Sequence, residues 1–213
     1  VSLTISATSG TGNAITYDSL STGQLTLTSV NTAANNLTVS ADQNVVASDV
    51  DTTTGGITVN TSNGTISLAD VDTASGAVDV DATGDITVTA NGGVTASGAS
   101  NINIDSSAGS IRNSAASDGT ADLVTVGGTI TLAGNTGIGD STGSAGLDID
   151  SGGGAVSLTH DGTTNGLYVD YVSADADAVS LTISATSGTG NAITYDSLST
   201  GQLTLTSVNT AAN

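Results

Sequence analysis

The feature that most constrains the fold of this chain is a repeat at two scales. Residues 179–213 repeat residues 1–35 letter for letter, at an offset of 178 residues. Within this long repeat, short apolar runs return at a much smaller spacing. Self-similarity at a period of about 20–50 residues indicates an architecture in which each unit stacks on its neighbours. We therefore interpret residues 1–213 as one continuous segment of a tandem array, with residues 1–178 as one full unit and residues 179–213 as the start of the next.

Two interleaved families of apolar positions carry the short period. The first family is Leu3, Leu25, Val45, Ile66, Ile86, Ile111, Ile130, Val156 and Leu181. The second family is Ile15, Leu37, Ile57, Val78, Ile102, Val124, Leu147, Leu167 and Ile193. Each family advances by about 20–26 residues per step and spans the same 178 residues. The spacing predicts eight coils per unit, with an average of about 22 residues in each coil.

The residues around these positions are typical of β-strands. Segments such as VSLTISA (1–7), NLTVSA (36–41) and GDITVTA (84–90) alternate apolar and small polar residues. Alternation with a period of two, rich in Val, Ile and Thr, indicates half-buried strands, and the Asn, Asp, Gly and Ser clusters between them indicate turns. We predict an all-β parallel solenoid, or β-helix, of right-handed sense. A further short strand near Val30, Val50 and Val71 would give three strands per coil, and eight rungs would make about 38 Å of rod.

Composition excludes several classes of function. Arg112 is the only basic residue besides one His, and the net charge is −19, so the chain cannot neutralise phosphates and we expect no nucleic-acid partner. Because Cys is absent, disulfides, thiol nucleophiles and Cys-ligated zinc are excluded. No apolar run approaches 18 residues, so the sequence predicts no membrane span. The absence of Pro, Phe and Trp suits a narrow core of stacked strands, because Pro would remove a hydrogen bond between strands.

Two long segments resemble a known family. GGTITLAGNTGIGDSTGSAGLDIDSGGGAVSLTHDG (127–162) and GDITVTANGGVTASGASNINID (84–105) are similar to the shaft repeats of filamentous-haemagglutinin-type giant bacterial adhesins. The resemblance implies secretion by a bacterium and an extracellular, cell-surface location. It also implies a structural fibre or adhesin stalk that acts in attachment, spacing or filament assembly. We expect no enzymatic activity, because the chain lacks the basic residues that a catalytic or sugar-binding site needs. The implied partners are copies of the chain end to end (in a covalent array or as stacked subunits), laterally bundled rods, and host or neighbouring cell surfaces reached through other domains.

Two other functions stay open at this stage. A flat face of hydroxyl side chains would suit a binding module for ice or carbohydrate, although Val46 and Arg112 interrupt that face and favour an ordinary soluble surface. The residues of this predicted face are Thr4, Ser6, Thr26, Thr28, Ser67, Ala69, Thr87, Thr89, Thr131, Ala133, Ser157, Thr159, Thr182 and Ser184. A polysaccharide-degrading β-helix enzyme would need clustered Asp residues near Arg112 or His160. A triad of Ser157, His160 and Asp161 would have to meet in space, and we expect His160 to be a corner residue instead.

Acidic side chains are the candidate metal ligands. We predict that one set lies outside the second family, and a second set stacks one coil above another at a spacing of 21 residues. The first set is Asp79, Asp81, Asp105, Asp148, Asp150 and Asp170, and the second set is Asp49, Asp51, Asp70 and Asp72. Carboxylates stacked about 5 Å apart repel by about 1 kcal/mol in water. Structural Ca²⁺, which takes oxygen ligands, would relieve this repulsion, whereas the alternative is a solvated acidic surface that maintains solubility.

Overall fold

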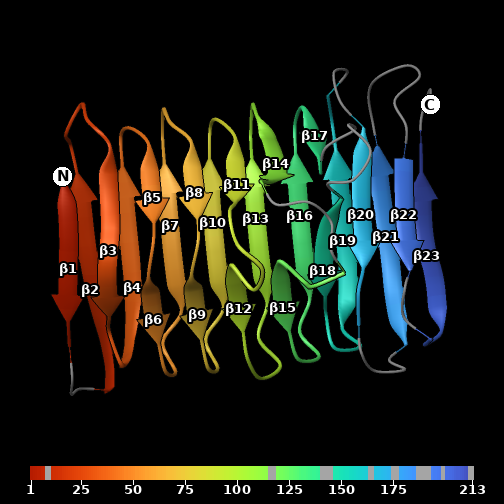
Figure 1. The fold of residues 1–213 in the computed structure, drawn as a ribbon, viewed down its shortest axis with the longest axis horizontal. Coiled ribbons are helices and arrows are strands. Elements are labelled where there is room, and N and C mark those ends of the chain that lie inside the picture. The colour runs from red at the N-terminus through yellow and green to blue at the C-terminus, as the bar shows by residue number, and fades with distance from the viewer. Residues whose placement is uncertain are drawn as a thin grey trace.

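The computed structural model describes residues 1–7, 11–114, 119–139, 146–162, 166–173, 178–185, 193–197 and 200–210. Its strands lie side by side along a rod, with the two chain ends at opposite ends of that rod (Figure 1). Every regular element in these ranges is a β-strand, and all the strand pairs are parallel, so the predicted all-β parallel solenoid is confirmed. The described part of the chain contains no helix long and apolar enough to cross a membrane.

One long side of the rod is a nine-stranded sheet. Its order follows the chain, because each coil adds one strand beside the strand of the preceding coil. The strands, in this order, are β2 (Thr11–Ser19), β4 (Ala34–Ala41), β7 (Ile57–Thr61), β10 (Val78–Ala82), β13 (Ile102–Ser106), β16 (Ile130–Gly134), β19 (Ala155–His160), β21 (Val179–Ala185) and β23 (Leu203–Asn209).

The remaining strands form a fourteen-stranded sheet in which most coils contribute two short strands. The first strand of each coil belongs to the series β1 (Ser2–Ser6), β3 (Leu25–Asn31), β5 (Val45–Ala47), β8 (Ile66–Leu68), β11 (Ile86–Val88), β14 (Ser110–Asn113), β17 (Gly137–Ile138), β20 (Leu167–Tyr171) and β22 (Ile193–Ser197). The second belongs to the series β6 (Val50–Thr52), β9 (Val71–Thr73), β12 (Val94–Ala96), β15 (Leu123–Thr125) and β18 (Leu147–Asp150). The predicted extra strand is therefore present, and β3 and β20 each span both series.

The predicted coil count is wrong, because the two apolar families exchange sheets in the second half of the chain. Ile102 pairs with Ile130 rather than with Val124, and Ile111 pairs with Ile138 rather than with Ile130. Between β1 and β21 the chain crosses from one sheet to the other fifteen times, which is seven and a half turns at roughly 24 residues per turn. Both sheets show the same alternation of inward apolar residues, so the period alone does not distinguish them.

The core is a thin column of aliphatic side chains between the two sheets. Burial alternates along the strands, as in β10, where Val78, Val80 and Ala82 are buried and the two Asp residues between them are partly exposed. Tyr171 is the largest fully buried side chain of the described residues. Tyr17 and Tyr195 pack against the core from inward positions, as the alternation predicts. Each buried rung contacts only the rungs next to it, so stability is close to a sum of nearest-neighbour terms.

Polar side chains join consecutive coils at the corners. Side-chain oxygens of Asn or Asp accept backbone N–H groups of the following coil, as for Asn44 with Thr65 (3.0 Å) and Asp85 with Ser110 (2.8 Å). At another corner the Thr73 hydroxyl donates to the Gly55 carbonyl at 3.0 Å and accepts the Gly76 N–H at 2.8 Å. A Cβ atom on Gly76 would stand 2.0 Å from the Gly55 oxygen, so this corner requires glycine because the coils approach so closely.

Candidate functional site

The first group of candidate acidic residues lies on the fourteen-stranded sheet. Asp51 in β6 and Asp72 in β9 are in register on adjacent coils, and both are partly exposed. Burial raises the pKa of both carboxyls, and the charges of Asp49 and Asp70 near Asp51, and of Asp70 near Asp72, raise it further. A hydrogen bond from Thr95 partly offsets the rise in the pKa of Asp72. The predicted stack of carboxylates on consecutive coils is therefore confirmed for this pair.

A second group lies on the opposite sheet, in the middle of the rod. Asp81 in β10 and Asp105 in β13 are in register, and Asp79 lies two residues before Asp81. Burial raises the pKa of Asp81 and of Asp105, and the Asp79 charge adds to both shifts. Asn103 stands opposite Asp79, and its Nδ2 donates to Asp79 Oδ1 at 2.7 Å. The Asn103 amide thus provides a hydrogen bond to a carboxylate oxygen of the preceding coil without neutralising its charge.

The third group shows that one prediction of an outward carboxylate is wrong. Asp148 in β18 is in register with Asp170 in β20, but Asp148 is only 1% exposed. The Gly119 N–H donates to Asp148 Oδ2 at 3.3 Å. Asp150 is partly exposed and accepts the Gly152 N–H at 2.9 Å within a turn. Both Asp148 and Asp150 therefore accept backbone N–H groups.

The ten predicted metal ligands are spread over both sheets rather than gathered on one face. Asp79, Asp81 and Asp105 lie on the nine-stranded sheet, whereas the others belong to strands or bends of the fourteen-stranded sheet. Across the ranges that the structure describes, no three His or Asp side chains come close enough together to hold a metal ion. Calcium binding by these carboxylates stays a prediction; the register aligns them in pairs on adjacent coils, and Asp196 extends the pair of Asp148 and Asp170 to a column of three.

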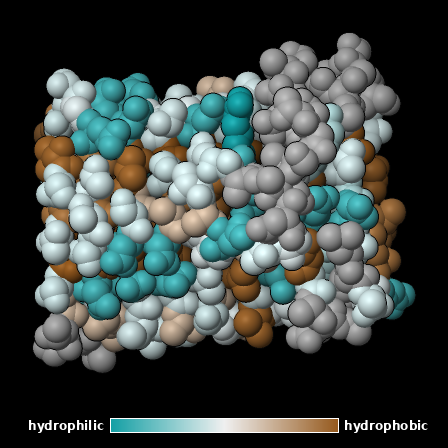
Figure 2. Space-filling view, in the orientation of Figure 1, coloured by the Kyte–Doolittle hydropathy of each residue, from teal (hydrophilic) through white to brown (hydrophobic). Residues whose placement is uncertain are grey.

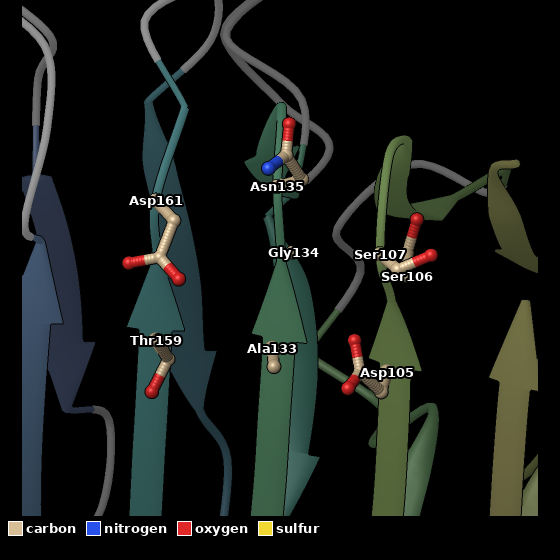
Figure 3. Close-up of a pocket in the computed structure, with 8 residues that line it drawn as sticks. All are labelled: Asp105, Ser106, Ser107, Ala133, Gly134, Asn135, Thr159 and Asp161. Carbon is tan, nitrogen blue, oxygen red and sulfur yellow. The ribbon is translucent and has the colours of Figure 1, made fainter. Parts of the chain in front are cut away.

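An acidic hollow of about 250 Å³ lies on the nine-stranded sheet (Figure 3). It lies over the ends of β13, β16 and β19, where Ala133 and Gly134 contribute almost no side chain between Asp105 and Thr159. Asp161 lines its other side, and its charge adds to burial in raising the pKa of Asp105. Sequence reasoning missed this hollow, although Ala133, a small residue in a column of otherwise polar outward residues that includes Asp81, Asp105 and Thr159, is the signal that could have found it.

The predicted hydroxyl face does not exist as one surface. Its first half, including Thr26, Ser67 and Thr87, lies on the fourteen-stranded sheet, whereas Thr131 and Ser157 lie on the nine-stranded sheet. The exchange of the two apolar families between sheets is the cause. Figure 2 accordingly shows separate hydrophilic patches among small polar residues on the visible side of the rod, not a continuous uniform face.

The residues proposed for catalysis are also separated. Arg112 lies on the fourteen-stranded sheet, where its Nε is 3.6 Å from Asp85 Oδ2. His160 is 1% exposed and points inward from the end of β19, so the expectation of a surface corner residue is wrong. Gly134 is its register partner on the preceding coil. Ser157 is on the outward side of the same strand, so Ser157 and His160 face opposite ways.

The arrangement as a whole offers hydroxyls, amides and isolated pairs of carboxylates on a rigid ladder of strands. Such a surface can accept hydrogen bonds along its length and attract cations. A comparison of the chain with protein-family models, with curated proteins and with solved structures finds no match.

Proposed function

We propose that this chain is a segment of an extracellular structural rod, built from tandem β-solenoid units and serving as a fibre or adhesin stalk. The observation that carries the proposal is the behaviour of the duplicated residues. Leu3 in β1 pairs with Leu27 in β3, with a register shift between Leu3 and Thr4. In the second copy Leu181 pairs with Leu205, and the register shifts again between Leu181 and Thr182.

A unit that repeats its own local pairing where the next unit begins can be extended without a change of geometry. The last coil also leaves apolar side chains uncovered, because Leu203, Leu205 and Val208 are 39%, 60% and 50% exposed. Figure 2 shows hydrophobic residues at both ends of the rod. We infer that further copies, end to end, cover these residues in the assembled fibre, since unpaired strands with apolar faces favour such pairing.

The charge of the chain suits a spacer. A net charge of −19 on a surface with a single Arg keeps rods soluble and apart at low ionic strength. Attachment to host or neighbouring cells would then depend on other domains, with the rod holding them away from a bacterial cell. Lateral bundling would use the hydroxyl-bearing columns and would become stronger as salt screens the acidic residues.

Electron microscopy of two proteins tests the rod directly. The first is residues 1–213, and the second carries one additional 178-residue unit. Seven and a half turns at about 4.8 Å per rung predict that the second rod is longer by about 36 Å at an unchanged width. Globular particles, or a particle that widens instead of lengthening, would overturn the proposal. An antibody against the chain tests the location, because it should label intact cells of the source organism without permeabilisation, and labelling only after lysis would contradict an extracellular fibre.

A further inference from the structure

The two copies of the duplicated segment lie on opposite sides of the solenoid. β1 belongs to the fourteen-stranded sheet, whereas β21, with the same residues, belongs to the nine-stranded sheet. The same exchange holds for the next two pairs of identical strands, since β2 and β23 are in the nine-stranded sheet and β22 and β3 are in the fourteen-stranded sheet. In Figure 1 the copies occupy the two ends of the rod.

The copies exchange sheets because one repeat does not complete a whole number of turns. One unit of 178 residues completes seven and a half turns, so the second copy begins on the sheet opposite the first. The local pairing is the same in both places, with Ser2 opposite Thr26 and Ser180 opposite Thr204. Even a side-chain contact is repeated, because Ser2 Oγ lies 2.6 Å from Thr28 Oγ1 and Ser180 Oγ lies 2.6 Å from Thr206 Oγ1. Either sheet therefore accepts the same strands.

We propose that consecutive units of the array are related by a half turn about the rod axis, an inference that rests on the tandem rod proposed above. Each surface of a unit then appears on alternate sides along the fibre. On any one side an identical surface recurs only after two units, which is fifteen turns or about 72 Å. The true structural period of the rod is twice its sequence period.

This alternation determines how the fibre meets a partner. The column of outward residues on the nine-stranded sheet that includes Thr131, Asn103 and Asp79 would lie on one side in one unit and on the opposite side in the next. A second rod, or any ligand that binds these hydroxyl, amide and carboxylate groups, therefore finds the same surface on both sides of the fibre, offset by one unit. The fibre has no unique binding side, and neighbours can pack against both.

Spin-label distances within the existing chain test the half turn. The chain has no Cys, so two introduced Cys residues are the only labelling sites. Thr16 and Thr182 belong to one column of the nine-stranded sheet, seven rungs apart, whereas Thr194, the duplicate of Thr16, lies on the other sheet. The half turn predicts a distance of about 34 Å, set by the rungs, for Thr16→Cys with Thr182→Cys.

The two spin labels should lie farther apart in Thr16→Cys with Thr194→Cys than in the first pair. They are separated by about 36 Å along the axis and by about 10 Å between the sheets, and they point in opposite directions. Thr38→Cys with Thr182→Cys, which is one rung shorter in the same column, is the matched control that calibrates the rise per rung. Equal distances for the first two pairs, or a shorter distance between the duplicates, would overturn the half turn. Neither result would affect the rod itself, which the lengths in electron micrographs test separately.

Discussion

Strands β3 and β23 have the same seven residues, yet their burial differs completely. In β3 the side chains of Leu25, Leu27 and Val30 are buried, whereas in β23 every residue is exposed. The reverse holds for the duplicated strands β1 and β21. Val179, Leu181 and Ile183 are buried in β21, whereas the residues of β1 are at most half-buried. The copy with a coil on each side is buried in both cases, and the copy at the end of the rod is not.

The difference shows that burial in this molecule is decided by the coils next to a strand and not by the sequence of the strand alone. A solenoid coil has no core of its own, so its apolar residues contribute to stability only through adjacent rungs. The duplicated segments therefore provide matched pairs of positions with identical local sequence, in which only the neighbours differ. Variants at such pairs test the comparison without a change of residue type.

The largest effect is expected at the matched leucines Leu27 and Leu205. Leu27 is fully buried and Leu205 is 60% exposed. Leu27→Ala should lower the free energy of unfolding by about 2–5 kcal/mol, because it leaves a cavity in the core. Leu205→Ala should change it by less than about 0.5 kcal/mol, as an exposed substitution does. Urea unfolding followed by circular dichroism measures both losses. Equal losses would contradict the conclusion that adjacent coils decide the burial of these leucines.

Two glycines that differ in how closely other atoms approach them test the packing of coils at the corners. Gly76→Ala places a methyl group against the Gly55 carbonyl, so we expect a loss of about 1–3 kcal/mol. Gly23 lies in the first coils, where the nearest atom to an added Cβ is Ser21 Oγ at 3.7 Å. Gly23→Ala should therefore be tolerated in the same unfolding experiment. If both variants unfold alike, the corner stacking inferred for the covered coils is incorrect.

A smaller effect is expected from pH, because burial, together with the charges of neighbouring carboxylates, raises the carboxyl pKa values in the covered coils. For Asp51, Asp72, Asp81 and Asp105 the folded pKa lies above the ordinary value of 3.8, so the folded chain binds more protons. Stability should rise as pH falls from neutral toward about 4, and should be lost again as pH rises through the folded pKa values. A melting temperature that falls steadily as pH falls from neutral to about 4 would contradict the stated pKa directions.

The variant Asp72→Asn sharpens that test. It should raise the free energy of unfolding at neutral pH by at most about 1 kcal/mol, because solvent partly screens the Asp72 carboxylate. The melting temperature should rise accordingly and should depend less on pH. Asp18→Asn is the matched control, since Asp18 is exposed near the end of the rod and stands opposite Ser40 instead of another acid. A larger gain from the control would contradict the assigned repulsion.

The smallest effect is expected from removal of divalent ions. The calcium hypothesis predicts that a chelator lowers the melting temperature. Columns of two or three carboxylates on adjacent coils predict no change, because Ca²⁺ in proteins takes about 6–8 oxygen ligands. With no group of three metal-ligating side chains among the described residues, we expect no change in EDTA at matched ionic strength. A fall in the melting temperature that added Ca²⁺ reverses would establish the calcium hypothesis instead.

Alternation and spacing were sufficient to predict the parallel strands, the third strand of a coil and most of the inward positions. Val124 is an exception, because Leu123 and Thr125 are the buried residues of β15. The spacing could not assign the strands after Ile111 to a sheet, because Ile130 in β16 and Ile138 in β17 both follow Ile111 at a distance that one coil can span. The burial of Asp148 and His160 was also beyond the pattern. Asp148 accepts the N–H of Gly119 and His160 lies opposite Gly134, and neither of these partners is near in sequence.

Cross-linking at Thr131 tests most directly that the coils stack as described. Asn103 and Thr131 are register partners on the nine-stranded sheet, whereas Arg112 lies on the opposite sheet. With no native Cys, Asn103→Cys with Thr131→Cys should join efficiently through a disulfide or a short thiol cross-linker, because adjacent strands are only about 4.8 Å apart. Arg112→Cys with Thr131→Cys should stay unlinked. Efficient linkage of the second pair and not the first would restore eight coils per unit and contradict a solenoid of seven and a half turns.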